Sequence, residues 1–298
     1  MKRLFVLVLI LCWLAPAFAS APLRTQHFVF YAGPEGQKAA AYLAQSADAI
    51  LQNMAASLGM QPGAVIDVHV VRDFEELYRS RPDAGRLPSW AAGAAYPEKN
   101  LIVLLINRGA GLDKTFLHET HHMLLGQAFK GGERVPRWLD EGLAMIWADE
   151  WSLSRLNTMT MAVLSGKLLP MDELAVHFPS DLRAAEIAYC QSFYFIAFLK
   201  SEFGNEAFQR FFREYIKHKD FTGALRLAYK MDWSELEKLW LKHTTLRFSW
   251  IPLITSTSTL WFAAALLFIA GYIRKKRKAR QILLAWQQEE SCSPDTRH

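Results

Sequence analysis

The spacing of apolar positions predicts a chain that begins with alternating strands and helices and continues almost wholly as helices. Short β-rich runs predict strands at residues 26–31, 65–71, 90–96 and 101–106, the last two joined by a Pro-Glu-Lys-Asn turn into a hairpin. Apolar positions at helical spacing predict helices at residues 37–58, 73–79, 113–125, 136–144, 153–164, 184–203, 206–217, 222–229 and 233–247. We therefore expect an α+β fold, with a small mixed β-sheet lobe (residues 20–110) followed by a helical lobe (residues 111–249).

The first twenty residues have the pattern of a secretory signal peptide. Lys2 and Arg3 precede an apolar run from Leu4 to Leu14, and Ala17-Phe18-Ala19 forms an A-x-A cleavage site. An uncleaved anchor is the competing interpretation, but an apolar run of about eleven residues is short for a bilayer that needs roughly 20. We predict a signal peptide at residues 1–19, cleaved after Ala19.

A second apolar stretch lies near the other end of the chain. Residues 250–273 carry no charge and are followed by Arg274-Lys275-Lys276-Arg277-Lys278. A helix of about 23 residues is roughly 35 Å long, enough for the hydrocarbon core, and basic clusters favour the cytoplasmic side. We predict one transmembrane helix at 250–273 in contact with the lipid bilayer, a cytoplasmic tail at 274–298, and a large periplasmic or extracellular domain.

Charge and cysteine usage agree with this topology. The net charge of +5 comes from the two ends of the chain, so the domain between them has no basic excess that would indicate nucleic-acid binding. Of the three cysteines, only Cys190 lies in the exported domain, which excludes a disulfide within it. We expect Cys190 to be a small buried apolar residue with no role as a nucleophile.

The segment that carries chemistry is His118-Glu119-Thr120-His121-His122, an H-E-x-x-H motif in the predicted helix 113–125. Residues four apart share a helix face, so His118 and His122 can bind one metal ion, with Glu119 beside it as a general base for a water. The alternative is a buried helix whose histidines form hydrogen bonds in the core. His121 lies on a different face, and we expect it to be a core residue.

A hydrolytic zinc site needs a third protein ligand and an open fourth position. Glu141 lies on the next predicted helix, with eighteen residues between it and His122. A helix, a loop and a second helix of these lengths allow the chain to fold back and present Glu141 to the same ion. The sequence therefore predicts one Zn²⁺ per chain, in a site between the two lobes.

The segments H-E-T-H-H and P-R-W-L-D-E-G-L-A at this spacing resemble the gluzincin metallopeptidases, the thermolysin and aminopeptidase N superfamily, and in particular the peptidase-MA-like domain. The resemblance implies that His118, His122 and Glu141 bind zinc and that Glu119 is the base.

The same resemblance extends to two segments around this site. It implies that Tyr189 donates to the oxyanion of the transition state, although a tyrosine packed in a helix is the simpler alternative. It also implies that the strand containing Gly93, Ala94 and Ala95 binds substrate. Small residues there are explained equally well by close packing of the strand on a helix.

The resemblance implies a membrane-anchored zinc metallopeptidase acting outside the cytoplasm on proteins or peptides. The segment from Gly93 to Asn100 departs from the G-x-M-E-N motif with which aminopeptidases bind the substrate amine, so we expect an endopeptidase. Two alternatives remain: an inactive binding or regulatory protein of the same fold, and a zinc amidase acting on the cell wall.

Overall fold

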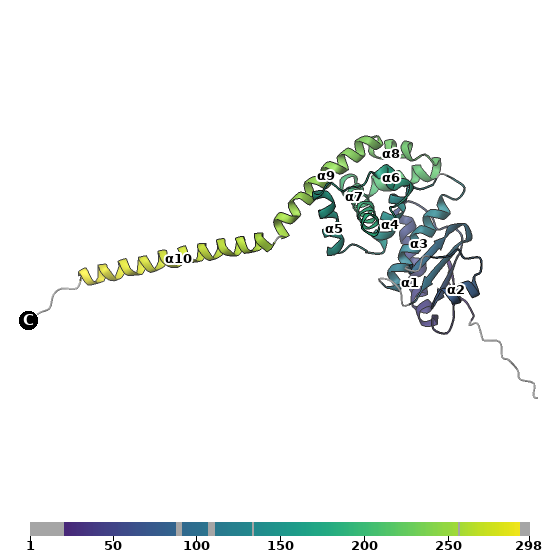
Figure 1. Cartoon of the computed structure of the whole chain (residues 1–298), viewed down its shortest axis with the longest axis horizontal. Helices are drawn as coiled ribbons and strands as arrows, with labels where there is room; N and C mark the ends of the chain where they lie inside the picture. The colour runs from purple at the N-terminus through teal and green to yellow at the C-terminus, as the bar shows by residue number, and fades with distance from the viewer. Residues whose placement is uncertain (1–20, 88–90, 107–110, 133, 256, 293–298) are drawn as a thin grey trace, which may run out of the picture. The chain divides into compact units, whose positions relative to one another are not determined.

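The computed structural model describes residues 21–87, 91–106, 111–132, 134–255 and 257–292 (Figure 1). The predicted signal peptide lies outside these residues. The chain forms two compact units: the first comprises Met1–Thr158 and Leu168–Trp240, and the second comprises Met159–Lys167 and Leu241–His298. The sheet and all of the predicted site residues belong to the first unit.

The described residues form one five-stranded sheet with the strand order β1-β2-β3-β5-β4. Its strands are β1 (Leu23–Arg24), β2 (Phe28–Ala32), β3 (Ile66–Val71), β5 (Leu101–Leu105) and β4 (Gly93–Tyr96). The three central strands are parallel, and β1 and β4 pair antiparallel at the two edges. The predicted hairpin of β4 and β5 is confirmed, with Gly93 opposite Leu104 and Tyr96 opposite Leu101.

Strand β5 is buried at every position because both of its faces are covered. Leu101, Val103 and Leu105 pack in one cluster with Leu77 of helix α2 (Phe74–Ser80). Alternate residues of a strand point to opposite faces, so Ile102 and Leu104 face the other side.

The second face of the sheet packs against helices α1 (Gln37–Ser57) and α3 (Leu112–Ala128). Phe116 of α3 lies 5.5 Å from Phe28 and 6.0 Å from Phe30 of β2, measured between ring centroids. This aromatic contact fixes α3, which carries the H-E-x-x-H motif, against the sheet.

The rest of the first unit is helical. Its helices are α4 (Arg137–Trp147), the start of α5 (Leu153–Leu164), α6 (Met171–Val176), α7 (Leu182–His218), α8 (Phe221–Tyr229) and the start of α9 (Trp233–Thr255). The α+β prediction of a small mixed sheet plus a helical lobe is confirmed. The predicted break between two helices at Gly204 appears inside α7, where this glycine has a φ of 78°.

Helix α4 packs closely on α7, and a glycine makes this approach feasible. A Cβ atom on Gly142 would lie 2.5 Å from the backbone oxygen of Ser192, well inside van der Waals contact. At the start of α4, the buried Trp138 stacks on Trp233 and contacts Phe195 of α7 edge-on, with centroids 5.6 and 4.8 Å apart. Cys190 of α7 is also buried, as predicted.

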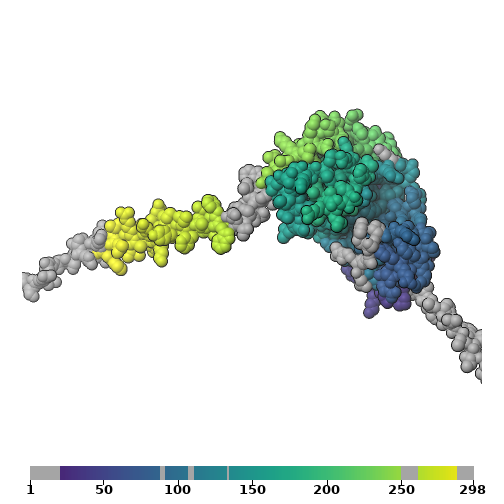
Figure 2. Space-filling model, in the orientation of Figure 1, coloured from purple at the N-terminus to yellow at the C-terminus, as the bar shows by residue number. Residues whose placement is uncertain are grey.

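The second unit contains helix α10 (Thr257–Cys292), whose large apolar side chains from Trp261 onward are exposed (Figure 2). Among the described residues, no helix combines the length and hydropathy needed to cross a membrane. The predicted transmembrane helix at 250–273 is therefore not confirmed. Of the predicted segment, residues 250–255 belong to α9 and residues 257–273 to α10, and residue 256 lies outside the described residues.

Candidate metal centre

Helices α3 and α4 pack together and bring the three predicted zinc ligands into one cluster. His118 and His122 are one turn apart on α3, and their ring centroids are separated by 4.7 Å. The Oε2 atom of Glu141, on α4, lies 3.7 Å from Nε2 of His118 and 3.8 Å from Nε2 of His122. Two atoms bound to one Zn²⁺ at 2.0–2.2 Å in a tetrahedral arrangement are about 3.3–3.6 Å apart. The three ligand atoms lie within 4.8 Å of one another, so small side-chain movements would bring them to a single ion.

The other ring nitrogen of each histidine is held by a carboxylate. Nδ1 of His118 is 3.0 Å from Oε1 of Glu150, and Nδ1 of His122 is 2.8 Å from Oδ1 of Asp140. A carboxylate accepts the Nδ1 proton and leaves the lone pair on Nε2, the atom directed at Glu141. This is the arrangement found around zinc-binding histidines, so the residues fit the metal that the motif implies.

The charges around the two imidazoles favour a cation. Burial lowers the pKa of each ring, but the facing carboxylates outweigh it. Hydrogen bonds with Glu141 and Glu150 raise the pKa of His118 to about 10, and Asp140 raises the pKa of His122 to about 9. The site attracts positive charge, and binding of a metal ion requires that each Nε2 be free of its proton.

Glu119 lies next to the ligand cluster, and its side chain is almost fully buried. Burial raises the pKa of Glu119, and the charges of His122 and His118 oppose that increase. Glu119 also lines an open cleft of about 740 Å³ together with His118 and Tyr189. A buried carboxylate that faces both the ligand histidines and a solvent-filled cleft has the position that a general base for water requires.

Tyr189 of α7 lines the same cleft and is held by two contacts. Its ring meets Phe178 edge-on, with centroids 4.9 Å apart, and its hydroxyl accepts a hydrogen bond from the Arg137 side chain. Burial, reinforced by the charge of Glu141, raises the pKa of Tyr189 to about 12. The phenol therefore keeps its proton at neutral pH and has a hydrogen to donate.

The predicted substrate strand is β4, at the edge of the sheet next to α3. Gly93 is packed tightly, because a Cβ on it would lie 2.7 Å from Cγ2 of Thr115 and 3.0 Å from Cγ of Glu119. Close packing of the strand on the helix therefore accounts for Gly93. The cleft is lined by Gly93 and the two alanines before it, whereas Ala94 and Ala95 continue along β4 beyond the cleft.

His121 takes no part in the ligand cluster. It is fully buried, its ring lies 6.2 Å from that of His122, and its Nε2 is 3.8 Å from Oδ1 of Asp140. This position agrees with the prediction that His121 is a core residue.

The sequence did not identify the residues that orient the ligands. Asp140 could have been found, since it directly precedes Glu141 and zinc-bound histidines usually pair with a carboxylate. Glu150 had no such signal: it follows α4, and Arg155 binds its Oε2 with an NH1–Oε2 distance of 3.0 Å. Arg137 was also missed, although it is one turn before Glu141 and its Nε lies 3.4 Å from Oε1 of that residue.

An α+β fold with an H-E-x-x-H helix and a glutamate from the following helix at one cluster defines the class of zinc metallopeptidase folds. The model of the Peptidase MA superfamily matches residues 45–245, and the chain belongs to this superfamily. The resemblance read from the two motifs is thereby confirmed.

Two solved structures are similar to part of this chain. An M1 zinc metallopeptidase variant from Deinococcus radiodurans is 15% identical over 74% of this chain and 51% of its own, with a TM-score of 0.36. A two-domain M1 zinc metallopeptidase variant bound to L-tryptophan is 16% identical over 76% of this chain and 50% of its own, with a TM-score of 0.37. The chain thus spans about half the length of these structures. No curated protein matches it.

Proposed function

We propose that this chain is a zinc-dependent metallopeptidase that hydrolyses peptide bonds with an activated water. The observation that carries the proposal is the convergence of three ligand atoms. Oε2 of Glu141 lies 3.7 Å from Nε2 of His118 and 3.8 Å from Nε2 of His122. Zn²⁺ held by these atoms supplies a Lewis acid for the scissile carbonyl and lowers the pKa of a water to about 7.

The chain's own residues then divide the proton transfers between them. The Glu119 carboxylate takes a proton from the attacking water and returns it to the leaving amine. Its burial, which raises its pKa, strengthens it as a base for the first transfer. The Tyr189 hydroxyl donates to the carbonyl oxygen as negative charge develops there, and the Arg137 side chain orients that hydroxyl.

We propose an endopeptidase as the finer assignment. Glu98 is the acidic residue nearest in sequence to the position where an aminopeptidase would bind the substrate amine. It lies in the 3-10 helix Pro97–Lys99, outside the cleft, and its Oε2 is 3.8 Å from Nζ of Lys130. Glu98 does not line the cleft, and this supports the endopeptidase proposal.

The test compares the wild type with Glu119→Gln for zinc content and for cleavage of a mixed peptide library with blocked and free N-termini. We expect about one zinc per chain in both proteins, internal cleavage of blocked peptides by the wild type, and a loss of about 10³-fold or more in the variant. Full activity of Glu119→Gln would refute the role of Glu119. Stoichiometric zinc without peptide cleavage would favour a binding protein or an amidase instead.

We propose that the enzyme acts outside the cytoplasm and is attached to a membrane near its C-terminus. The support is the signal-peptide pattern at residues 1–19, the basic cluster after Ile273, and exposed apolar side chains such as Trp261 and Phe268. Fractionation of cells expressing the full chain, followed by protease treatment of intact cells or spheroplasts, tests both parts. Recovery in the soluble cytoplasmic fraction would contradict them.

A further inference from the structure

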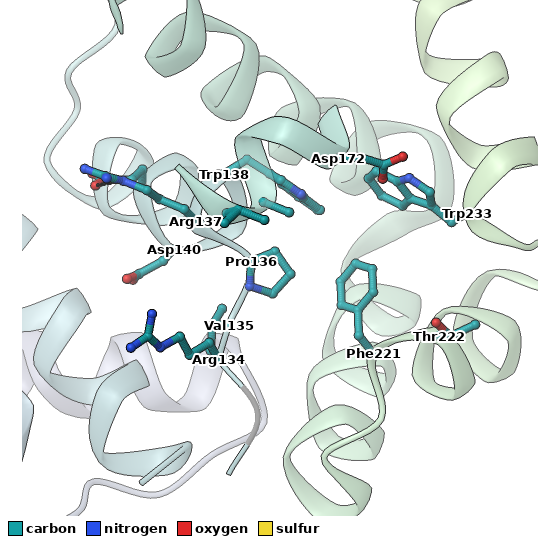
Figure 3. Close-up of a pocket in the computed structure, with 13 residues that line it drawn as sticks. Arg134, Val135, Pro136, Arg137, Trp138, Asp140, Asp172, Phe221, Thr222 and Trp233 are labelled. Atoms are coloured by element: carbon teal, nitrogen blue, oxygen red, sulfur yellow. Dashed lines mark ion pairs between the residues drawn. The ribbon is translucent and has the colours of Figure 1, made fainter. Parts of the chain in front are cut away.

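A second cavity, of about 760 Å³, is lined by the ligand residue Glu141 together with residues that do not line the catalytic cleft (Figure 3). Its walls come from the start of α4, from α6, and from the starts of α8 and α9. Cavities of roughly 300–1,000 Å³ are the size of ligand sites, so this one can hold several groups of a bound chain. The proposed chemistry uses Glu141 and Arg137 from its lining but places no part of the substrate in it.

The cavity has a charged side and an aromatic side. Arg134 and Arg137 lie on the charged side in Figure 3 with Asp140 between them, whereas Phe221 and Trp233 lie on the other side, with Asp172 close to Trp233. Asp140 and Glu141 also line the cavity, but both face the ligand histidines, with Oδ1 of Asp140 2.8 Å from Nδ1 of His122 and Oε2 of Glu141 3.8 Å from Nε2 of His122. The two sides therefore offer different chemistry to a ligand that spans them.

The arginines are open to a ligand. Arg134 is exposed, and among the described residues its guanidinium has no ion-pair partner. The Arg137 side chain is 45% exposed. Its Nε faces Glu141, it donates a hydrogen bond to the Tyr189 hydroxyl, and its plane lies over the Phe178 ring, 4.9 Å from the centroid, which leaves further N–H groups for a ligand. An arginine pair with free donors binds a carboxylate well, because the guanidinium fork matches its two oxygens.

The second cavity and the catalytic cleft both border the ligand cluster. Glu141 lines the cavity and His118 lines the cleft, and these two residues belong to the same cluster. A peptide whose scissile bond lies at the ligand cluster would therefore have both hollows within its reach.

We propose that this cavity is a substrate subsite that binds a carboxylate of the peptide at Arg134 and Arg137, with a large apolar side chain against Phe221 and Trp233. This inference rests on the proposed peptidase function and adds a substrate class to it. The carboxylate can be an acidic side chain or a free C-terminus, since both present the same two oxygens.

The test measures binding of labelled peptides by fluorescence anisotropy to the full-length, zinc-loaded Glu119→Gln variant, which does not consume them. In the first pair, both peptides have an amidated C-terminus, and one contains Phe-Glu where the other contains Phe-Gln. In the second pair, both peptides end in Phe, and one has a free C-terminal carboxylate where the other has an amide. We expect the carboxylate member of at least one pair to bind about tenfold more tightly, as a charged hydrogen bond of about 1.4 kcal/mol would give. The pair that discriminates identifies the source of the carboxylate.

Adding Arg134→Gln should remove the discrimination, and adding Arg210→Gln should preserve it. Arg210 is a suitable control because it is also an exposed arginine and it lines neither cavity. Equal affinities within both pairs, no binding of any peptide, or discrimination that survives Arg134→Gln would each overturn the subsite. Peptide cleavage by the wild type is measured separately, so a protein that discriminates but never cleaves would refute the peptidase proposal and leave the carboxylate site intact.

Discussion

Replacing Asp140 by alanine should weaken zinc binding although Asp140 itself touches no metal. Its Oδ1 lies 2.8 Å from Nδ1 of His122 and is the acceptor that directs the Nε2 lone pair of His122 at the ion. A hydrogen bond to a charged group contributes about 1.5–3 kcal/mol, and loss of a carboxylate that orients a zinc ligand typically lowers metal affinity about 10–100-fold. The two ranges agree, because 10–100-fold corresponds to about 1.4–2.8 kcal/mol.

The assay is competition for Zn²⁺ with a chromophoric chelator at neutral pH, with Asp140→Ala, Asp140→Asn and Asp172→Ala compared with the wild type. The asparagine oxygen still accepts the Nδ1 proton but has no charge, so its zinc Kd should fall between those of the wild type and the alanine variant. Asp172 is exposed on α6 and makes no contact with a ligand histidine, so its variant should bind zinc as the wild type does.

A specific result would refute this reasoning. If Asp140→Ala bound zinc within twofold of the wild type and kept its helical circular dichroism, Asp140 would not orient His122. If Asp140→Ala loses zinc because it unfolds, its melting temperature will show this. The zinc affinity of Asp140→Asn then decides whether Asp140 orients His122.

Three further changes probe the packing, the acid stability and the chemistry. Gly142→Ala should lower the free energy of unfolding by about 1–3 kcal/mol in chemical denaturation, because its Cβ would overlap the backbone of Ser192; Gly271→Ala, with no atom within 4 Å, should not destabilise the chain. Burial holds the pKa of His69 at about 4, below its usual 6.5, so the unfolded chain takes up the proton first as the pH falls. Stability should then decline between pH 6.5 and 4, by up to about 3 kcal/mol, and replacing His69 by asparagine should reduce this decline when the two unfolding curves are compared. Tyr189→Phe should lower kcat with little change in zinc content or KM, and loss of zinc would instead place Tyr189 among the groups that hold the metal.

The ligand set was predictable because its geometry is local. His118 and His122 share a face of any regular helix, and their convergence required only that residues 113–125 be helical. Glu141 needed one further condition, that the next helix pack on the first. Gly142, which follows Glu141, permits a different close contact: it lets the opposite side of α4 pack against α7.

The residues that support the site were less predictable, because their positions depend on irregular backbone. Glu150 reaches His118 from the segment between α4 and α5, where Asp149 adopts a left-handed conformation with a φ of 47°. No periodic pattern describes such a turn. Strand β1 and helix α6 were missed for a related reason: two and six residues are too few to show a period.

For the apolar segment at 250–273, composition does not determine the bounds of the helices. Hydropathy and the following basic cluster predict a single spanning helix, but they do not determine where one helix ends and the next begins. In the structure, residues 250–255 belong to α9 and residues 257–273 to α10, and no helix among the described residues combines the length and hydropathy needed to cross a membrane.

The electrostatic balance of the site explains why a metal ion is its natural occupant. Glu119, Asp140, Glu141 and Glu150 surround two imidazoles, and each of these acids is largely removed from water. Several negative charges in a region of low dielectric are unfavourable unless positive charge neutralises them. Protons on both histidines provide part of that neutralisation, as their raised pKa values show. A divalent cation provides it at the three ligand atoms themselves and frees the Nε2 lone pairs to bind, so zinc binding should stabilise the fold as well as complete the site.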